Sequence, residues 1–170
     1  MNYWGLIPLL SCCAFTVLCI LVLSQAKRWV ERVFGLFLFA SAIWSFTSFM
    51  LVYNPNAPFQ YLRLWNGLVL TVMPWVGVSY YHFVRAYNNK PAGILLYIYY
   101  VAIIAILIAN LKGVMVKSAA IIDGFVYHNI KPWDYVIAGL LVVSLVSVFY
   151  MLVRRYRESA DSADRNRTMY

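Results

Sequence analysis

Few residues in this chain have side chains that could do chemistry, and their spacing does not assemble a catalytic site. The 170 residues include two histidines, His82 and His128, six Asp and Glu residues, and three cysteines. A nucleophilic Ser or Cys needs a histidine base and an orienting carboxylate within reach. Cys12, Cys13 and Cys19 share one apolar run with no histidine nearby, and there thiols act as small apolar groups. We therefore predict no enzymatic activity, no metal site and no cofactor.

One apolar stretch contains three residues that a simple membrane helix does not need. The segment LTVMPWVGVSYYHFVRAY, residues 70–87, includes Pro74, Gly77 and His82. A proline inside a helix removes one backbone hydrogen bond and bends the helix, and a nearby glycine loosens it further. Such a bend provides either a hinge or a place for a small ligand. For His82 we favour a hydrogen bond to a neighbouring helix, with pH or signal sensing as the alternative.

These features predict a pocket for a small apolar ligand between the second and third apolar stretches. Polar groups inside a membrane are expensive to bury, and they mark sites where a ligand or a partner helix binds. The predicted ligand-binding residues are Trp44, Asn66, Pro74, Trp75 and His82. Ser41, Ser45 and Ser48 share one face of the second stretch, where small residues allow close helix packing or dimerisation.

Five long apolar stretches must position these residues. They cover residues 5–23, 33–53, 64–84, 93–111 and 135–153 and contain no Asp, Glu, Lys or Arg. Each is 19 to 21 residues long, and about 20 helical residues cross the hydrocarbon core of a bilayer. The chain is 64% apolar and only 12% charged, whereas about a quarter of a soluble domain is charged. We predict an all-α integral membrane protein, a five-transmembrane-helix bundle whose immediate partner is the lipid bilayer.

The placement of the basic residues predicts the orientation of this bundle. With the N-terminus outside, ten of the fourteen Lys and Arg residues lie on the cytoplasmic side and four lie outside. This bias follows the positive-inside rule, and aromatic residues such as Trp29 and Trp133 flank the spans as interfacial rings do. We predict N-out/C-in topology. The net charge of +8 is then a topology signal, and we expect no nucleic-acid partner.

Two polar segments join or follow the spans. Residues 111–133 link the last two spans, and Asp123-Gly124 within them suits a type I′ hairpin turn between apolar segments. We predict a short extracytoplasmic hairpin-like loop over the outer end of the bundle, with an inert loop as the alternative. Residues 154–170 form a polar cytoplasmic tail. Either this tail once led to further helices and an output domain, or the natural product ends there.

Three segments carry motifs of a known family. They are AIWSFTSFML at 42–51, LRLWNGLVLTVMP at 62–74 and WVGVSYYHFVRAYNNKP at 75–91. They resemble the N-terminal seven-transmembrane-helix sensor region of bacterial histidine kinases, which typically has Ala-x-Trp on its second helix and a mid-helix proline followed by aromatic residues on its third. The segments KPW at 131–133 and DRNR at 164–167 are also similar. Only five of the seven helices are present, and the phosphoacceptor, ATP-binding and DNA-binding segments are missing.

The resemblance implies a membrane sensory module, the signal-input part of a histidine-kinase-like receptor that lacks its output domain. The expected location is the bacterial cytoplasmic membrane. A homodimer partner or a cytoplasmic signalling partner would then receive the signal. Two alternatives remain open: a stand-alone five-helix binder or carrier of a small ligand, and a non-catalytic structural membrane protein or remnant reading frame.

Overall fold

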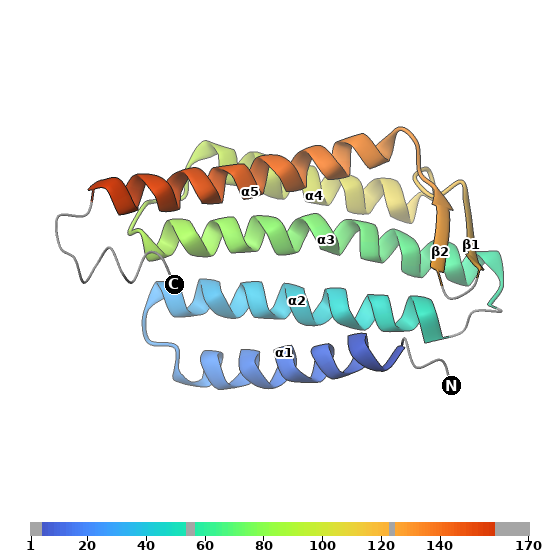
Figure 1. Ribbon diagram of the computed structural model, residues 1–170, viewed down its shortest axis with the longest axis horizontal. Coiled ribbons are helices and arrows are strands. Elements are labelled where there is room, and N and C mark those ends of the chain that lie inside the picture. The colour runs from blue at the N-terminus through green and yellow to red at the C-terminus, as the bar shows by residue number, and fades with distance from the viewer. Residues whose placement is uncertain (1–4, 54–56, 123–124, 159–170) are drawn as a thin grey trace.

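The computed structural model describes residues 5–53, 57–122 and 125–158 of the chain (Figure 1). In these residues the elements are α1 (Leu6–Gln25), α2 (Trp29–Tyr53), α3 (Phe59–Tyr87), α4 (Ile94–Leu111), β1 (Ser118–Ile122), β2 (Phe125–Asn129) and α5 (Trp133–Glu158). All five helices are long and apolar enough to cross a membrane. The chain is therefore a multi-pass α-helical membrane protein.

Helix α3 lies at the centre of the bundle. It packs against α2 on one side and against both α4 and α5 on the other, while α1 packs against the far side of α2 (Figure 1). All five helix axes run roughly along the long axis of the molecule. We call the end with the two strands the hairpin end, and the end where α3 passes into α4 the basic end.

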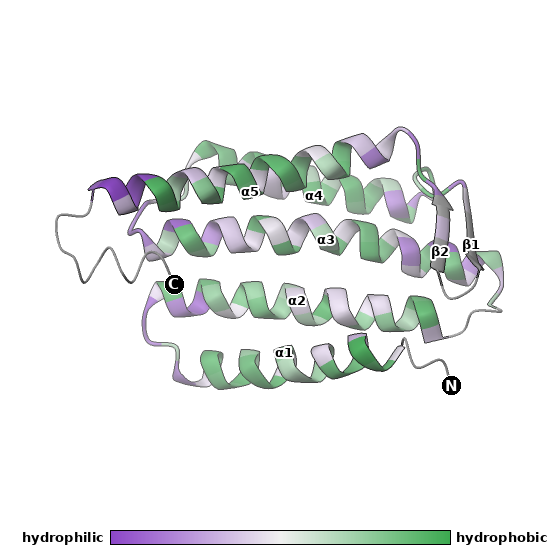
Figure 2. Cartoon of the chain, in the orientation of Figure 1, coloured by the Kyte–Doolittle hydropathy of each residue, from purple (hydrophilic) through white to green (hydrophobic). Residues whose placement is uncertain are grey.

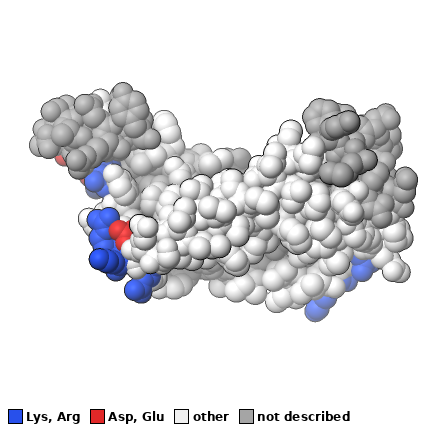
Figure 3. All heavy atoms as spheres, turned by 90° about the horizontal axis from the view of Figure 1, so that it is seen from below, with Lys and Arg blue, Asp and Glu red and all other residues white. Residues whose placement is uncertain are grey.

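Apolar side chains cover the outside of the bundle between these two ends. Ile94 is 80% exposed, and long rows of Val, Leu, Ile and Phe on α1, α4 and α5 are exposed in the same way. Figure 2 shows hydrophilic colour concentrated near the helix ends. On the face seen in Figure 3, Lys and Arg atoms gather at the two ends and leave the stretch between them uncharged. Lipid is the solvent that such a surface requires.

The interior divides into two clusters along α3. Near the basic end, buried residues of α3, α4 and α5 pack together, namely Val78, Tyr81, Val84, Leu96, Tyr99, Ile103, Val148 and Met151. Near the hairpin end the cluster consists of Leu70, Ile106, Met115, Val116, Ile130 and Ile137. The segments flanking the two strands thus cover the hairpin end of the helices.

Four of the five helices extend beyond their predicted spans, whereas α4 (Ile94–Leu111) lies within its span. Helix α2 begins at Trp29, since the Glu31 carboxylate accepts the backbone N–H groups of Lys27 and Arg28 at 2.8 and 2.9 Å. Helix α5 continues to Glu158, which pairs with Arg154 at 2.6 Å. The first residues of the predicted polar tail are therefore helical, and residues 159–170 lie outside the described part.

The connection between α4 and α5 contains two paired strands where the sequence predicts a short hairpin. β1 and β2 are antiparallel, with Ser118 opposite Asn129 and Ile122 opposite Phe125. The predicted turn, Asp123-Gly124, lies outside the described residues. Next to the strands, Met115 and Ile130 are buried against the helix ends.

Small residues let neighbouring helices approach closely. A Cβ atom on Gly35 would lie 2.3 Å from Leu23 of α1, so α1 and α2 meet through the glycine. Ser41 and Ser45 are only 3% and 5% exposed. These two serines are buried within a single chain, so they form a packing face inside the bundle. Of the two predicted uses of this serine face, Ser41 and Ser45 serve close helix packing within the chain, and dimerisation stays a prediction.

Candidate functional site

The five predicted ligand-binding residues lie along α2 and α3 but do not form one site. Trp44 is 39% exposed on the surface of α2, whereas Asn66 on α3 is only 1% exposed. Pro74 is fully buried, and α3 continues through it as one helix. Trp75 packs edge-to-face on Phe39, with ring centroids 6.2 Å apart.

Of the five predicted ligand-binding residues, His82 lines a cavity in the described part of the chain. Trp44, Asn66, Pro74 and Trp75 line none of three cavities in this part of the chain. A pocket near Trp44, Asn66 and Trp75 is thus not among them. Two regions of α3 remain as candidates for a site: a polar contact with α4 near the hairpin end, and the cavity at the basic end.

The polar contact joins α3 to α4 through an asparagine. Asn110 Nδ2 donates to the backbone carbonyl of Gly67 at 2.7 Å and also to Thr71 Oγ1. The Thr71 hydroxyl donates in turn to the same Gly67 carbonyl at 2.9 Å. A Cβ atom on Gly67 would lie 3.0 Å from Asn110 Oδ1, so the absence of a side chain there permits the contact. This arrangement fixes the spacing of the two helices.

Three buried polar side-chain atoms have no hydrogen-bond partner among the described residues. They are Asn66 Nδ2, Asn110 Oδ1 and Tyr99 Oη. Such a group ordinarily costs about 1–3 kcal/mol. Asn66 and Tyr99 line none of the three cavities described for these residues, and Asn110 lines a cavity of only about 100 Å³. These atoms therefore do not define a ligand site by themselves.

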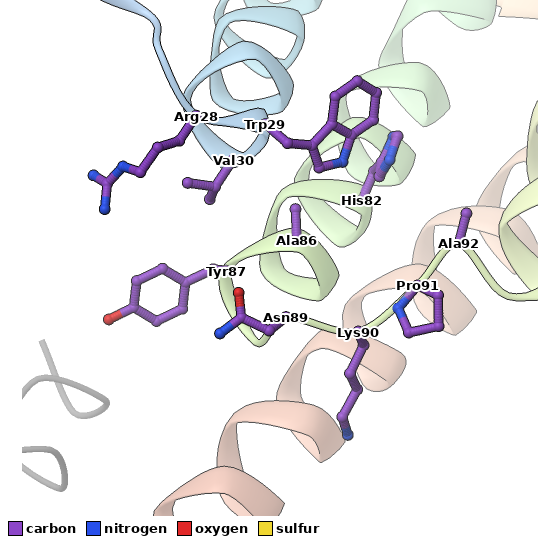
Figure 4. A pocket seen from close by; sticks show the side chains of 10 residues that line it. All are labelled: Arg28, Trp29, Val30, His82, Ala86, Tyr87, Asn89, Lys90, Pro91 and Ala92. Carbon is purple, nitrogen blue, oxygen red and sulfur yellow. The ribbon is translucent and has the colours of Figure 1, made fainter.

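The cavity at the basic end has a volume of about 610 Å³. Its walls come from the start of α2, the end of α3 and the turn into α4, and its lining residues are Arg28, Trp29, Val30, His82, Ala86, Tyr87, Asn89, Lys90, Pro91 and Ala92 (Figure 4). Small-molecule pockets are typically about 300–1,000 Å³ and mostly apolar with a few polar groups. Both the size and the lining fit that description.

His82 holds one wall of this cavity in place. Its Nδ1 atom lies 3.0 Å from the hydroxyl of Tyr100 on α4. On the opposite side its ring lies against Trp29 of α2, with centroids 6.1 Å apart, and Figure 4 shows the two rings side by side. His82 thereby connects three helices. The predicted hydrogen bond from His82 to a neighbouring helix is present.

The turn from α3 to α4 forms the second wall. Asn89 has φ +53°, a left-handed conformation that asparagine tolerates at a helix end. The guanidinium of Arg85 folds over the turn, donating through Nε to the Pro91 carbonyl at 3.1 Å and through Nη1 to the Tyr81 hydroxyl at 3.2 Å. The backbone of the turn is therefore held by the last turn of α3.

An arginine ties the same end of α3 to α5. Arg155 Nη1 donates to the Tyr87 carbonyl at 3.1 Å and to Asn88 Oδ1 at 2.9 Å. Its guanidinium also lies over the Tyr87 ring, 4.8 Å from the centroid. Tyr87 is at once a cavity wall and a contact of α5. The Tyr87 wall of the cavity is therefore in direct contact with α5.

This arrangement is suited to binding a small molecule. In the described residues no group of three or more His, Cys, Asp and Glu side chains is placed to hold a metal ion. The cavity offers cationic and hydrogen-bonding groups beside apolar walls. Tyr100 and Arg155 cannot be assigned to a site from the sequence, because no spacing rule pairs residues so far apart in the chain.

Comparisons of this chain with protein-family models, with curated proteins and with solved structures find no match. The geometry of the bundle is therefore the basis for any functional assignment. The class that it defines is a multi-pass helical membrane protein with a cavity at its basic end.

Proposed function

We propose that this chain is a membrane sensory module. In this proposal, an occupant of the basic-end cavity shifts the end of α3, and α3 moves the end of α5 that leads into the polar tail. The observation that carries the proposal is the Arg155 bridge, which joins the cavity wall at Tyr87 to α5. The resemblance to the sensor region of bacterial histidine kinases supports the same role.

The proposal includes a location and an orientation. The chain lies in a bacterial cytoplasmic membrane with the basic end, and hence the tail, on the cytoplasmic side. The Lys and Arg residues that accumulate at this end support that orientation. A cytoplasmic partner or a second copy of the chain receives the displacement of α5.

A second candidate is a stand-alone binder or carrier of a small ligand. The cavity of about 610 Å³ favours binding in either case. The two functions differ in transmission, because a carrier does not need α5 to respond when the cavity is filled. The link through Arg155 favours the sensory module.

The test is a chimera in which the output half of a histidine kinase follows Tyr170. Autophosphorylation in membrane vesicles is measured for the parent, for His82→Ala, for Pro74→Ala and for Arg155→Gln. We expect each variant to change the activity by about fivefold or more, the lower range of allosteric coupling. Tyr97→Ala is the control, since Tyr97 is 61% exposed on the outside of α4.

If all three variants match the Tyr97→Ala control, the sensory proposal is wrong. Orientation is tested separately with a reporter enzyme that is active only in the cytoplasm. Fused after Tyr170 it should be active, and inserted after Lys117 beside β1 it should be inactive. The reverse pattern would contradict the N-out/C-in orientation.

A further inference from the structure

We propose that the basic-end cavity binds a phosphate ester, namely the headgroup of an anionic phospholipid. This inference names the ligand class for the site used in the proposed function and rests on that site, while the binding itself does not require signalling. The position of the cavity, its charges and its shape each support the assignment.

The cavity lies at the depth where headgroups lie. It forms where the apolar helices end and the Lys and Arg residues begin, as Figure 3 shows for one face of the molecule. Trp29 is exposed at its rim. Amphipathic rings such as indole prefer the membrane–water interface. A ligand entering from the lipid side would bring its polar group to this level and leave its chains in the hydrocarbon.

The lining is cationic. Arg28 and Lys90 line the cavity, and none of the ten lining residues is Asp or Glu. Arg28 is paired with Glu31 at 2.7 Å, but the described residues give Lys90 no ion pair. The lysine ammonium sits on a flexible stem and binds phosphate as a point charge. Lys90 is therefore the cation available to an incoming anion.

Other polar groups line the same cavity. His82 uses Nδ1 toward Tyr100, and within the described part of the chain its Nε2 atom has no hydrogen-bond partner. The Trp29 indole is likewise without a hydrogen-bond partner there. Figure 4 shows the two rings together on one wall of the cavity, with Asn89 across from them. A phosphate with several acceptor oxygens can use donors arranged in this way.

The remaining walls are apolar. Val30, Ala86, Pro91 and Ala92 line the cavity without polar side-chain atoms. A free inorganic phosphate has no carbon atoms to pack against such walls. A phospholipid has them in its glycerol and in the first carbons of its acyl chains. The volume of about 610 Å³ also exceeds what a single phosphate needs. These features favour the lipid over a soluble ion.

The test counts bound lipid on the purified full-length chain by native mass spectrometry. The protein in neutral detergent is titrated with phosphatidylglycerol, with phosphatidylcholine and with inorganic phosphate as a competitor. We expect phosphatidylglycerol to bind more tightly than phosphatidylcholine. Lys90→Gln should weaken phosphatidylglycerol binding by about fivefold, the usual effect of one lysine near an anionic lipid. Lys90→Arg should retain it.

Lys117→Gln is the matched control, because this exposed lysine lies near the opposite end of the bundle. Equal affinity for the two lipids, or equal loss in Lys90→Gln and Lys117→Gln, would overturn the inference. A third outcome is that inorganic phosphate displaces the lipid and that the chain shows no preference for phosphatidylglycerol. This outcome would assign the site to soluble phosphate and overturn the lipid assignment. If phosphatidylglycerol binds but the autophosphorylation of the kinase chimera does not change, the proposed function is wrong. The lipid assignment is then still supported.

Discussion

Helices α3 and α4 meet in two different ways at the two ends of the bundle. Near the hairpin end, Asn110 bonds directly to the backbone of α3 at Gly67, where no side chain separates the helices. Near the basic end, rings hold them apart: His82 meets Tyr100, and Tyr81 packs edge-to-face on Tyr99 with centroids 5.5 Å apart. Close backbone contact fixes a helix, whereas contacts between long side chains allow it to shift.

Helix α3 also approaches α5 closely at Gly77, next to Val78 of the basic-end cluster. Gly77 faces Ser144, and a Cβ atom on the glycine would lie 2.9 Å from Ser144 Oγ. Beyond Gly77, toward the basic end, α3 reaches α5 through larger side chains and through Arg155. Close contacts of α3 with its neighbours thus run from Gly67 to Gly77. We predict that this part of α3 is fixed and that the segment beyond Gly77, beside the cavity, is the movable part.

The largest expected effect comes from separating the helices at the fixed end. Gly67→Val would place a branched side chain against Asn110, which a Cβ atom alone would already approach to 3.0 Å. We expect the free energy of unfolding to fall by about 1–3 kcal/mol, the usual result of overpacking. Unfolding of the reconstituted chain in mixed micelles with rising SDS measures it.

Gly139→Val is the matched control for this prediction. Gly139 lies on α5, and a Cβ atom there would meet nothing within 4 Å. The control should change the free energy of unfolding by less than about 0.5 kcal/mol, as surface substitutions do. Equal losses in the two variants would mean that helix approach at Gly67 does not stabilise the bundle.

A smaller effect is expected from removing the hydrogen bonds while leaving the glycine. Asn110→Ala removes the bonds to the Gly67 carbonyl and to Thr71. We expect a loss of about 1 kcal/mol, within the range for hydrogen bonds between membrane helices. A double-mutant cycle with Thr71→Ala should give a coupling energy of several tenths of a kcal/mol. Strict additivity would show that the pair does not interact in the membrane.

The number of helices was predictable from the sequence, and the site was not. Uninterrupted apolar runs of sufficient length define spans regardless of tertiary contacts, so all five helices lie where the composition predicts them. Their ends were less predictable, because the helices continue as long as capping groups such as Glu31 are available. The N-out/C-in orientation and the family resemblance stay predictions.

The candidate site depends on contacts across the chain that no local pattern contains. A histidine inside an apolar span is unusual, and this signal identifies His82, which lines the cavity. The Ala-x-Trp motif singles out Trp44, yet Trp44 lies exposed on the surface of α2. Asn110 could be recognised as polar, but only the fold shows that it reaches Gly67. Periodicity predicts faces of a helix, not which helix covers them.

The smallest expected effect is at the movable end. Tyr100→Phe removes only the hydroxyl that meets His82 Nδ1. We expect a loss of about 0.6 kcal/mol, the average for a hydrogen bond between membrane helices, because ring packing around the cavity remains. Tyr97→Phe on the exposed face of α4 should cause no measurable loss.

Tyr100→Phe also tests whether the two ends of α3 differ in mobility. If the basic end is the movable part of α3, Tyr100→Phe should increase amide hydrogen exchange near the His82 end of α3 and leave exchange around Gly67 unchanged. Opening of a weakly held segment raises exchange locally, without changing the global free energy of unfolding by the same amount. A loss as large as that of Asn110→Ala, with exchange rising along the whole of α3, would contradict the division into a fixed and a movable half. In that case α3 would respond as one rigid unit, and the cavity could act on α5 only by moving the entire helix.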